Sequence, residues 1–112
     1  MLDHKGMDRL LHALGDRTRR SIVERLATGP ASASELARPH QMTLSAVMQH
    51  LTVLERAGLV RSQKDGRVRS YQLDTTPLRA AEAWISTQRT AWETGLDRLG
   101  EALTQTQPTQ RG

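Results

Sequence analysis

Residues 42–60 read MTLSAVMQHLTVLERAGLV, and this stretch carries two sets of side chains that both have the spacing of a helix. Val47, Leu51 and Leu54 are separated by four and three residues, so they share one narrow apolar face, and Gly58 continues the spacing. A second set with the same spacing is wholly polar and consists of Ser45, Gln49, Thr52 and Arg56. Such a helix can pack on its own domain and still offer hydrogen-bonding groups to a DNA groove.

Three shorter helices are expected before this one, after a poorly ordered start at residues 1–6. Thr43 can cap the long helix, whose interior runs to about Ala57. The earlier helices have their own caps and breakers, which are Gly15 after the first, Asp16 and Gly29-Pro30 around the second, and Ser32 or Ser34 and Pro39 around the third.

Two strand-like runs, residues 59–64 and 68–73, flank Asp65-Gly66, a pair that favours a hairpin turn. Helices followed by a hairpin predict a mainly α fold with a small β-hairpin wing, the winged helix-turn-helix. The hairpin is basic, with Lys64 as a candidate phosphate contact and Arg67 and Arg69 as candidates for reaching phosphate or the minor groove. Arg67 and Arg69 are one residue apart and would point to the same side of a strand. A solvated hairpin that only keeps the protein soluble is the alternative.

Thr76-Pro77 restarts a helix, and residues 77–103 carry apolar side chains at heptad spacing. We expect this long helix to pack against its copy in a homodimer. The alternative is that it folds back on its own domain. Residues 1–103 would form a single domain, and residues 104–112 a disordered polar tail. The expected dimer interface consists of Leu78, Ile85, Trp92, Leu96, Leu99 and Leu103.

The composition narrows the function. The net charge is +4, and the whole excess lies in residues 1–75, which hold 12 Lys/Arg against 8 Asp/Glu. The chain has no cysteine, which excludes disulfides and thiolate metal sites. Without a long apolar run or a signal-peptide pattern, a cytoplasmic protein is expected. No G-x-S-x-G, glycine-rich phosphate loop or H-E-x-x-H is present, so an enzyme is not expected.

Three segments resemble a known family. Residues 13–20, ALGDRTRR, resemble its ALGDPTRR, residues 51–60 match its HLKVLEEAGLV, and residues 61–73, RSQKDGRVRSYQL, resemble its wing RKEGRVRYYRL. These are marks of the ArsR/SmtB family of bacterial winged-helix repressors. The segments around Pro77–Ile85 and Trp92–Leu99 resemble a metal-independent branch, and the likeness covers residues 7–103. The resemblance implies a dimeric repressor that releases its operator when an effector binds. The symmetry of a dimer predicts that this operator is an imperfect inverted repeat.

The chain departs from the founding members of that family, which sense metals through cysteines or through histidines and acids on the last helix. Residues 77–103 contain no histidine, and the four histidines are scattered at positions 4, 12, 40 and 50. We therefore expect no metal and no cofactor, and take a metal- or ligand-sensing repressor as the alternative. A small organic ligand near Trp84 and Trp92, or no effector at all with autorepression, both stay open.

The resemblance also implies which residues meet DNA. Relatives commonly have serine where this chain has Met48 and a basic residue where it has Gln49, which predicts an operator richer in A·T pairs. Met48 could instead fill the core. Arg19 and Arg20 are expected to contact phosphate or form ion pairs. An activator, or an interaction module that has lost DNA binding, is a competing function. Leu44, Ser45, Met48 and Gln49 would reach base edges, and Thr43 and His50 the backbone.

Overall fold

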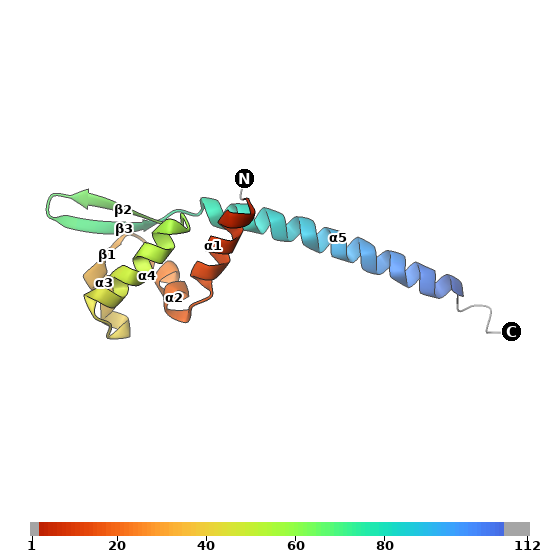
Figure 1. Cartoon of the computed structure of the whole chain (residues 1–112), viewed down its shortest axis with the longest axis horizontal. Coiled ribbons are helices and arrows are strands. Elements are labelled where there is room, and N and C mark those ends of the chain that lie inside the picture. Colours follow the sequence, from red (N-terminus) through yellow and green to blue (C-terminus); the bar gives the residue numbers. More distant parts are fainter. Residues whose placement is uncertain (1–2, 107–112) are drawn as a thin grey trace. The chain divides into compact units, whose positions relative to one another are not determined.

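The computed structural model of the chain describes residues 3–106, and the chain divides into two units, residues 1–81 and 82–112. Figure 1 shows the elements along the chain. The expectation of a single domain over residues 1–103 stays a prediction. Helix α5, Thr76–Thr106, begins in the first unit and makes up the described part of the second. The other elements are α1 His4–Leu14, α2 Arg17–Leu26, β1 Ala31–Ser32, α3 Ala33–Ala37, the 3₁₀ helix η1 Arg38–His40, α4 Leu44–Arg56, β2 Val60–Asp65 and β3 Val68–Leu73.

Side chains that accept free backbone N–H groups begin the first four α-helices. Ser32 and Glu35 form a reciprocal capping box at α3, which decides between the two predicted starts of that helix. Asp3 accepts from the backbone N–H of Gly6, so α1 begins at His4. The expectation of a poorly ordered start is therefore wrong for residues 4–6. The capping residues, in chain order, are Asp3, Asp16, Ser32 and Thr43.

Helix α4 ends in a Schellman motif that turns the chain into the sheet. The N–H of Leu59 donates to the carbonyl of Leu54 over 3.0 Å, and the N–H of Gly58 donates to the carbonyl of Glu55 over 2.9 Å. Gly58 has φ +76°, the left-handed backbone that this motif requires and that glycine adopts without strain. The predicted end of the helix at Gly58 is confirmed.

The sheet has three antiparallel strands in the order β1-β3-β2. Asp65 pairs with Val68, so the hairpin turn is Gly66-Arg67 and the predicted Asp65-Gly66 turn is wrong by one residue. Gly66 has φ +67° and is followed by a residue with negative φ, the pattern of a type II′ turn. A type I′ turn at Asp65-Gly66 would force Asp65 into the left-handed region as well. Arg67 lies in the turn, so the argument that it shares a strand face with Arg69 is wrong.

The apolar stripe of α4 forms the centre of the core. Val47, Leu51 and Leu54 are completely buried, as the sequence predicts. Replacing Leu51 with alanine would cost about 2–5 kcal/mol of folding free energy. The core residues around the stripe include Leu10, Ala13, Ile22, Leu26, Ala31, Leu36, Leu59, Val60, Tyr71 and Ala81.

Helix α5 starts where Asp74 Oδ1 accepts the backbone N–H of Thr76 over 3.0 Å. Its first turns belong to the first unit, where Ala81 is part of the core and Leu78 packs against it. The helix continues to Thr106, so residues 104–106 are helical and not part of a disordered tail. The rest of the predicted tail, 107–112, lies outside the described residues. None of the described helices is long and apolar enough to span a bilayer.

Candidate nucleic-acid interface

One face of α4 is exposed along the whole helix, opposite the buried stripe. Leu44 is 53% exposed and Met48 42%, large fractions for apolar side chains of a small domain. Ser45 and Gln49 are exposed beside them, and Thr43 is the exposed cap whose hydroxyl accepts the N–H of Ala46. The structure therefore gathers the residues predicted to reach bases on one surface, at the N-terminal end of α4.

Met48 is both exposed on the outer face of α4 and in contact with the core, which are the two alternatives that the sequence leaves open. The hydroxyl of Tyr71 on β3 donates to Met48 Sδ over 3.6 Å, and Tyr71 is only 2% exposed. Burial raises the pKa of the Tyr71 hydroxyl, and the nearby Glu55 carboxylate raises it further against the opposing charge of Arg69, so the group stays protonated and can donate. The sulfur of Met48 is thus held by a core residue while much of its side chain remains on the surface.

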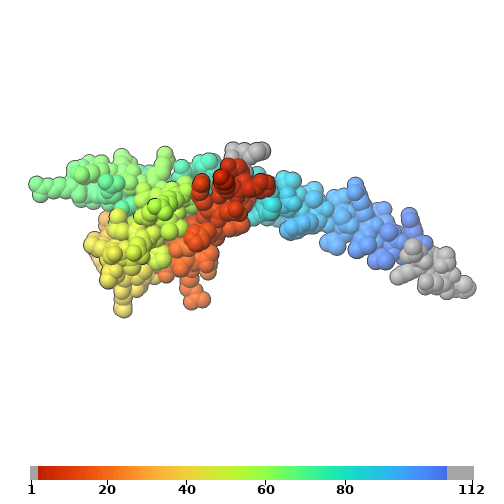
Figure 2. Space-filling model, viewed as in Figure 1, coloured from red at the N-terminus to blue at the C-terminus, as the bar shows by residue number. Residues whose placement is uncertain are grey.

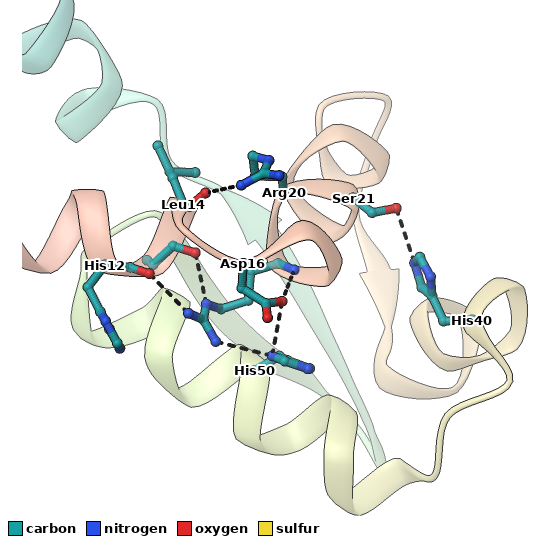
Figure 3. Close-up of polar contacts among 9 residues, drawn as sticks. His12, Leu14, Asp16, Arg20, Ser21, His40 and His50 are labelled. Atoms are coloured by element: carbon teal, nitrogen blue, oxygen red, sulfur yellow. Dashed lines mark hydrogen bonds and ion pairs between the residues drawn. The ribbon is translucent and has the colours of Figure 1, made fainter.

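His50 is turned toward α2, although the resemblance implies a contact with the DNA backbone. Its Nδ1 atom lies 3.4 Å from Arg19 Nη1 and 4.0 Å from Asp16 Oδ2 (Figure 3). The pKa of Asp16 lies below its ordinary value, chiefly because its carboxylate accepts the backbone N–H of Arg19. Partial burial raises this pKa, whereas the charges of Arg19 and His50 lower it further. These contacts join the middle of α4 to the N-terminus of α2.

Arg19 and Arg20 bind backbone carbonyls at the end of α1. Arg19 Nε donates to Ala13 O over 2.8 Å and Nη2 to His12 O over 3.0 Å, while Arg20 Nη1 donates to Leu14 O over 2.7 Å. Cations at a helix C-terminus also complement its dipole. Both side chains therefore stabilise the fold of the first unit. The sequence had suggested phosphate contacts or ion pairs for them instead.

A further contact holds the segment that leads into α4. Ser21 Oγ on α2 lies 3.1 Å from His40 Nε2 on η1, as Figure 3 shows. This contact ties η1, which is separated from α4 by three residues, to α2, and the His50 contacts tie the middle of α4 to the same helix. Helix α2 therefore supports both α4 and the segment that leads into it.

The hairpin of β2 and β3 projects beyond the helices of the first unit (Figures 1 and 2). Lys64 and Arg69 stand directly opposite each other and so lie on the same face of the sheet. That face also carries Tyr71, which pairs with Ser62 and is buried further along the hairpin. Arg69 Nη1 donates to Ser62 Oγ over 2.9 Å.

The charges of the wing suit an anionic partner. Lys64, Arg67 and Arg69 are all exposed, and Asp65 is the one acidic residue of Arg61–Arg69. Like charges directly opposite each other in a sheet repel, and an anion placed between them would relieve the repulsion. DNA phosphate is such an anion, and its neutralisation by Lys and Arg also releases counterions.

Sequence reasoning missed Tyr71 and the contacts of Asp16 and Arg19 with His50. The prediction that Asp16 caps the second helix is confirmed. Tyr71 had a detectable signal, because it is the only tyrosine in the chain and lies on the strand beside the basic residues. Its partner Met48 is 23 positions away, and no periodic pattern connects them. Within residues 3–106 no three His, Asp or Glu side chains form a group that could hold a metal ion, and the absence of a metal sensor stays a prediction.

A helix with one exposed face, followed along the chain by a basic β-hairpin, is the arrangement of a winged helix-turn-helix DNA-binding protein. Residues 14–63 match the model of a helix-turn-helix domain family. The HTH-type transcriptional regulator Rv2034 of Mycobacterium tuberculosis is 50% identical over 80 residues, which cover 71% of this chain and 75% of that protein.

Two solved structures agree with this assignment. An ArsR family transcriptional regulator shares 40% identity and a TM-score of 0.76, over 83% of this chain and 97% of the other. An ArsR-like transcriptional regulator from Rhodococcus sp. RHA1 shares 28% identity and a TM-score of 0.78, over 86% and 91%. The chain belongs to the ArsR family of DNA-binding transcriptional regulators, and it is not an enzyme.

Proposed function

We propose that this regulator binds an inverted-repeat operator as a homodimer, with α4 of each copy in a major groove and each wing on the neighbouring backbone. The observation that carries the proposal is the exposed N-terminal face of α4, which the contact between Met48 and Tyr71 links to the strand that carries Arg69. Thr43 and Leu44 lie at the helix end that would enter the groove first. Half-site centres are expected about one turn of DNA apart, ~10–11 base pairs.

The second copy is proposed because α5 exposes a long apolar seam. Trp92 is 64% exposed and Leu96 66%, and Ile85, Leu99 and Leu103 are also exposed. These residues follow heptad spacing, which is the pattern that a matching helix of a second copy covers best. Leu78, also predicted for this interface, packs against the core of its own unit.

Repression is the proposed direction of regulation, since a dimer seated on a promoter excludes other proteins from it and the ArsR/SmtB resemblance implies a repressor. The site of action would be the cytoplasm of a bacterial cell. In transcription from a promoter that contains the operator, added protein should lower transcript yield. A rise in yield would instead identify an activator.

Selection of bound sequences from a random duplex library tests the proposed DNA recognition. The expected result is enrichment of an imperfect inverted repeat, with protection of both half-sites in footprinting. Enrichment of a single unrepeated site would contradict the dimeric arrangement. No enrichment at all, together with salt-independent weak binding, would favour the interaction module that has lost DNA binding.

A further inference from the structure

Tyr71 connects the core and the wing strand to the exposed face of α4. Its ring is buried, and its hydroxyl donates to Met48 Sδ over 3.6 Å. A buried tyrosine hydroxyl needs a hydrogen-bond partner, and here the thioether supplies it. Tyr71 is also two residues from Arg69, on the same face of β3. One strand therefore carries both a wing cation and the residue that holds Met48.

The contact matters because methionine is a poor choice for reading a base unless something orders it. The side chain is unbranched, with three rotatable bonds, and on an exposed helix face it samples many rotamers. Ordering it only when DNA binds would cost conformational entropy, whereas ordering it beforehand avoids that cost. A fixed sulfur leaves mainly the terminal methyl group free to rotate.

We propose that Tyr71 is a positioning residue for DNA recognition, whose hydroxyl holds Met48 so that the methionine methyl meets the C5-methyl group of a thymine in each half-site. The inference rests on the proposed function, in which Met48 faces the major groove. It also explains why the side chain is only partly exposed although it lies on the outer face of α4. Apolar contact with the thymine methyl is an established mode of base reading.

The experiment is a double-mutant cycle in the protein, measured on duplexes from which one methyl group at a time has been removed. Tyr71→Phe removes the hydroxyl and keeps the ring, and Met48→Leu removes the sulfur at similar volume. Each thymine of the selected half-site is replaced in turn by deoxyuridine, which lacks only the C5-methyl group. The dissociation constant of each protein for each duplex is measured by fluorescence anisotropy at fixed salt.

The unchanged protein should bind thymine over deoxyuridine by about threefold to fivefold at one position, the value expected for one buried methyl group. Tyr71→Phe should bring this ratio close to one, while its affinity for a random duplex stays unchanged. In the Met48→Leu background, Tyr71→Phe should have no further effect on the ratio. Circular dichroism of each variant establishes that the fold is intact.

Three results would overturn the inference. Tyr71→Phe could keep the full preference for thymine while Met48→Leu loses it, which would leave the proposed function standing. It could weaken binding to all duplexes alike and lower the thermal midpoint, which is the behaviour of a purely structural residue. Finally, neither variant could change the preference for thymine at any position of the half-site, which would mean that Met48 reads no base. Failure of the proposed function is recognised separately, as absence of specific binding by the unchanged protein.

Discussion

Nη1 of Arg19 lies 3.4 Å from Nδ1 of His50, so the start of α2 and the middle of α4 are joined directly. A guanidinium only donates hydrogen bonds, so this contact is a hydrogen bond in the tautomer of His50 that leaves Nδ1 free to accept. The same Arg19 side chain also donates to the last carbonyls of α1. One residue therefore connects three helices behind the surface that is proposed to face DNA.

Arg19→Ala should lower the free energy of unfolding by about 1–2 kcal/mol, because it leaves two carbonyls and one imidazole without their charged donor. Urea unfolding followed by circular dichroism measures the change. Arg17→Ala is the matched control, since Arg17 is exposed and lies in the first turn of the same helix. An equal loss in both variants would show that only the charge of α2 matters.

Asp16 should make stability depend on acid. Its pKa is lowered in the folded state, chiefly by the backbone N–H of Arg19, so its contribution is present above its ordinary value of 3.8 and is lost as the pH falls below that. Asp16→Asn keeps a capping oxygen but cannot titrate. Urea midpoints measured from about pH 6 down to about pH 2.5 should fall less steeply for this variant.

Glu35 and Asp74 contribute to the same acid limb, because backbone N–H groups of Ser32 and Thr76 respectively lower their pKa values. Asp16→Asn should therefore reduce the acid dependence without abolishing it. If the urea midpoint of Asp16→Asn fell with decreasing pH as steeply as that of the unchanged protein, the charge of Asp16 would not contribute to stability.

Gly66→Ala should destabilise the wing by about 1–2 kcal/mol, since an L-residue is strained in the left-handed backbone of the turn. Gly100→Ala, in α5, should stabilise its helix by about 0.5–1 kcal/mol. At neither glycine does an added Cβ meet an atom within 4 Å, so the pair isolates backbone conformation. The midpoint of thermal unfolding should fall in Gly66→Ala and rise in Gly100→Ala. Shifts of the same sign in the two variants would contradict the turn assignment.

Trp92→Ala should raise the dissociation constant of the proposed homodimer by about tenfold or more, as loss of a central aromatic residue does in other interfaces. Sedimentation velocity over a concentration series gives this constant. Glu93→Ala removes the neighbouring side chain on another face of the helix and should leave it unchanged. An unchanged protein that sediments only as a monomer at micromolar concentration would contradict the dimer itself.

The helices were predictable because their limits depend on short-range chemistry. Asp16, Thr43 and Gly58 each act within five residues, and all three mark real helix ends. Strand β1 was missed because its two residues have no period, and they form a strand only through pairing with Tyr71 and Ser70. The turn was misplaced because Asp-Gly is a good local pair in isolation, whereas a turn at Gly66-Arg67 needs only one residue with positive φ.

The candidate site, like the fold, could be predicted from the sequence only in part. The polar residues on the exposed face of α4 followed from their spacing, and the basic hairpin followed from its strand-like runs and its charge. The resemblance added Leu44 and Met48 as residues that would reach bases. The contacts of Met48 with Tyr71 and of His50 with Arg19 are 23 and 31 positions apart, and sequence periodicity carries no information over such distances. Arg19 also shows why a basic residue in a DNA-binding protein need not meet phosphate, because helix carbonyls compete for the same donor.

The central claim is that α4 reads bases while the wing holds phosphate, and salt-titrated binding to the selected operator tests it most directly. Gln49→Ala should relax specificity at one position of each half-site and keep the slope of log affinity against log salt. Arg67→Ala should weaken binding to every sequence and reduce that slope by about 1.8 for a dimer that loses two phosphate contacts. If both variants changed specificity and slope alike, the division of roles between α4 and the wing would be contradicted.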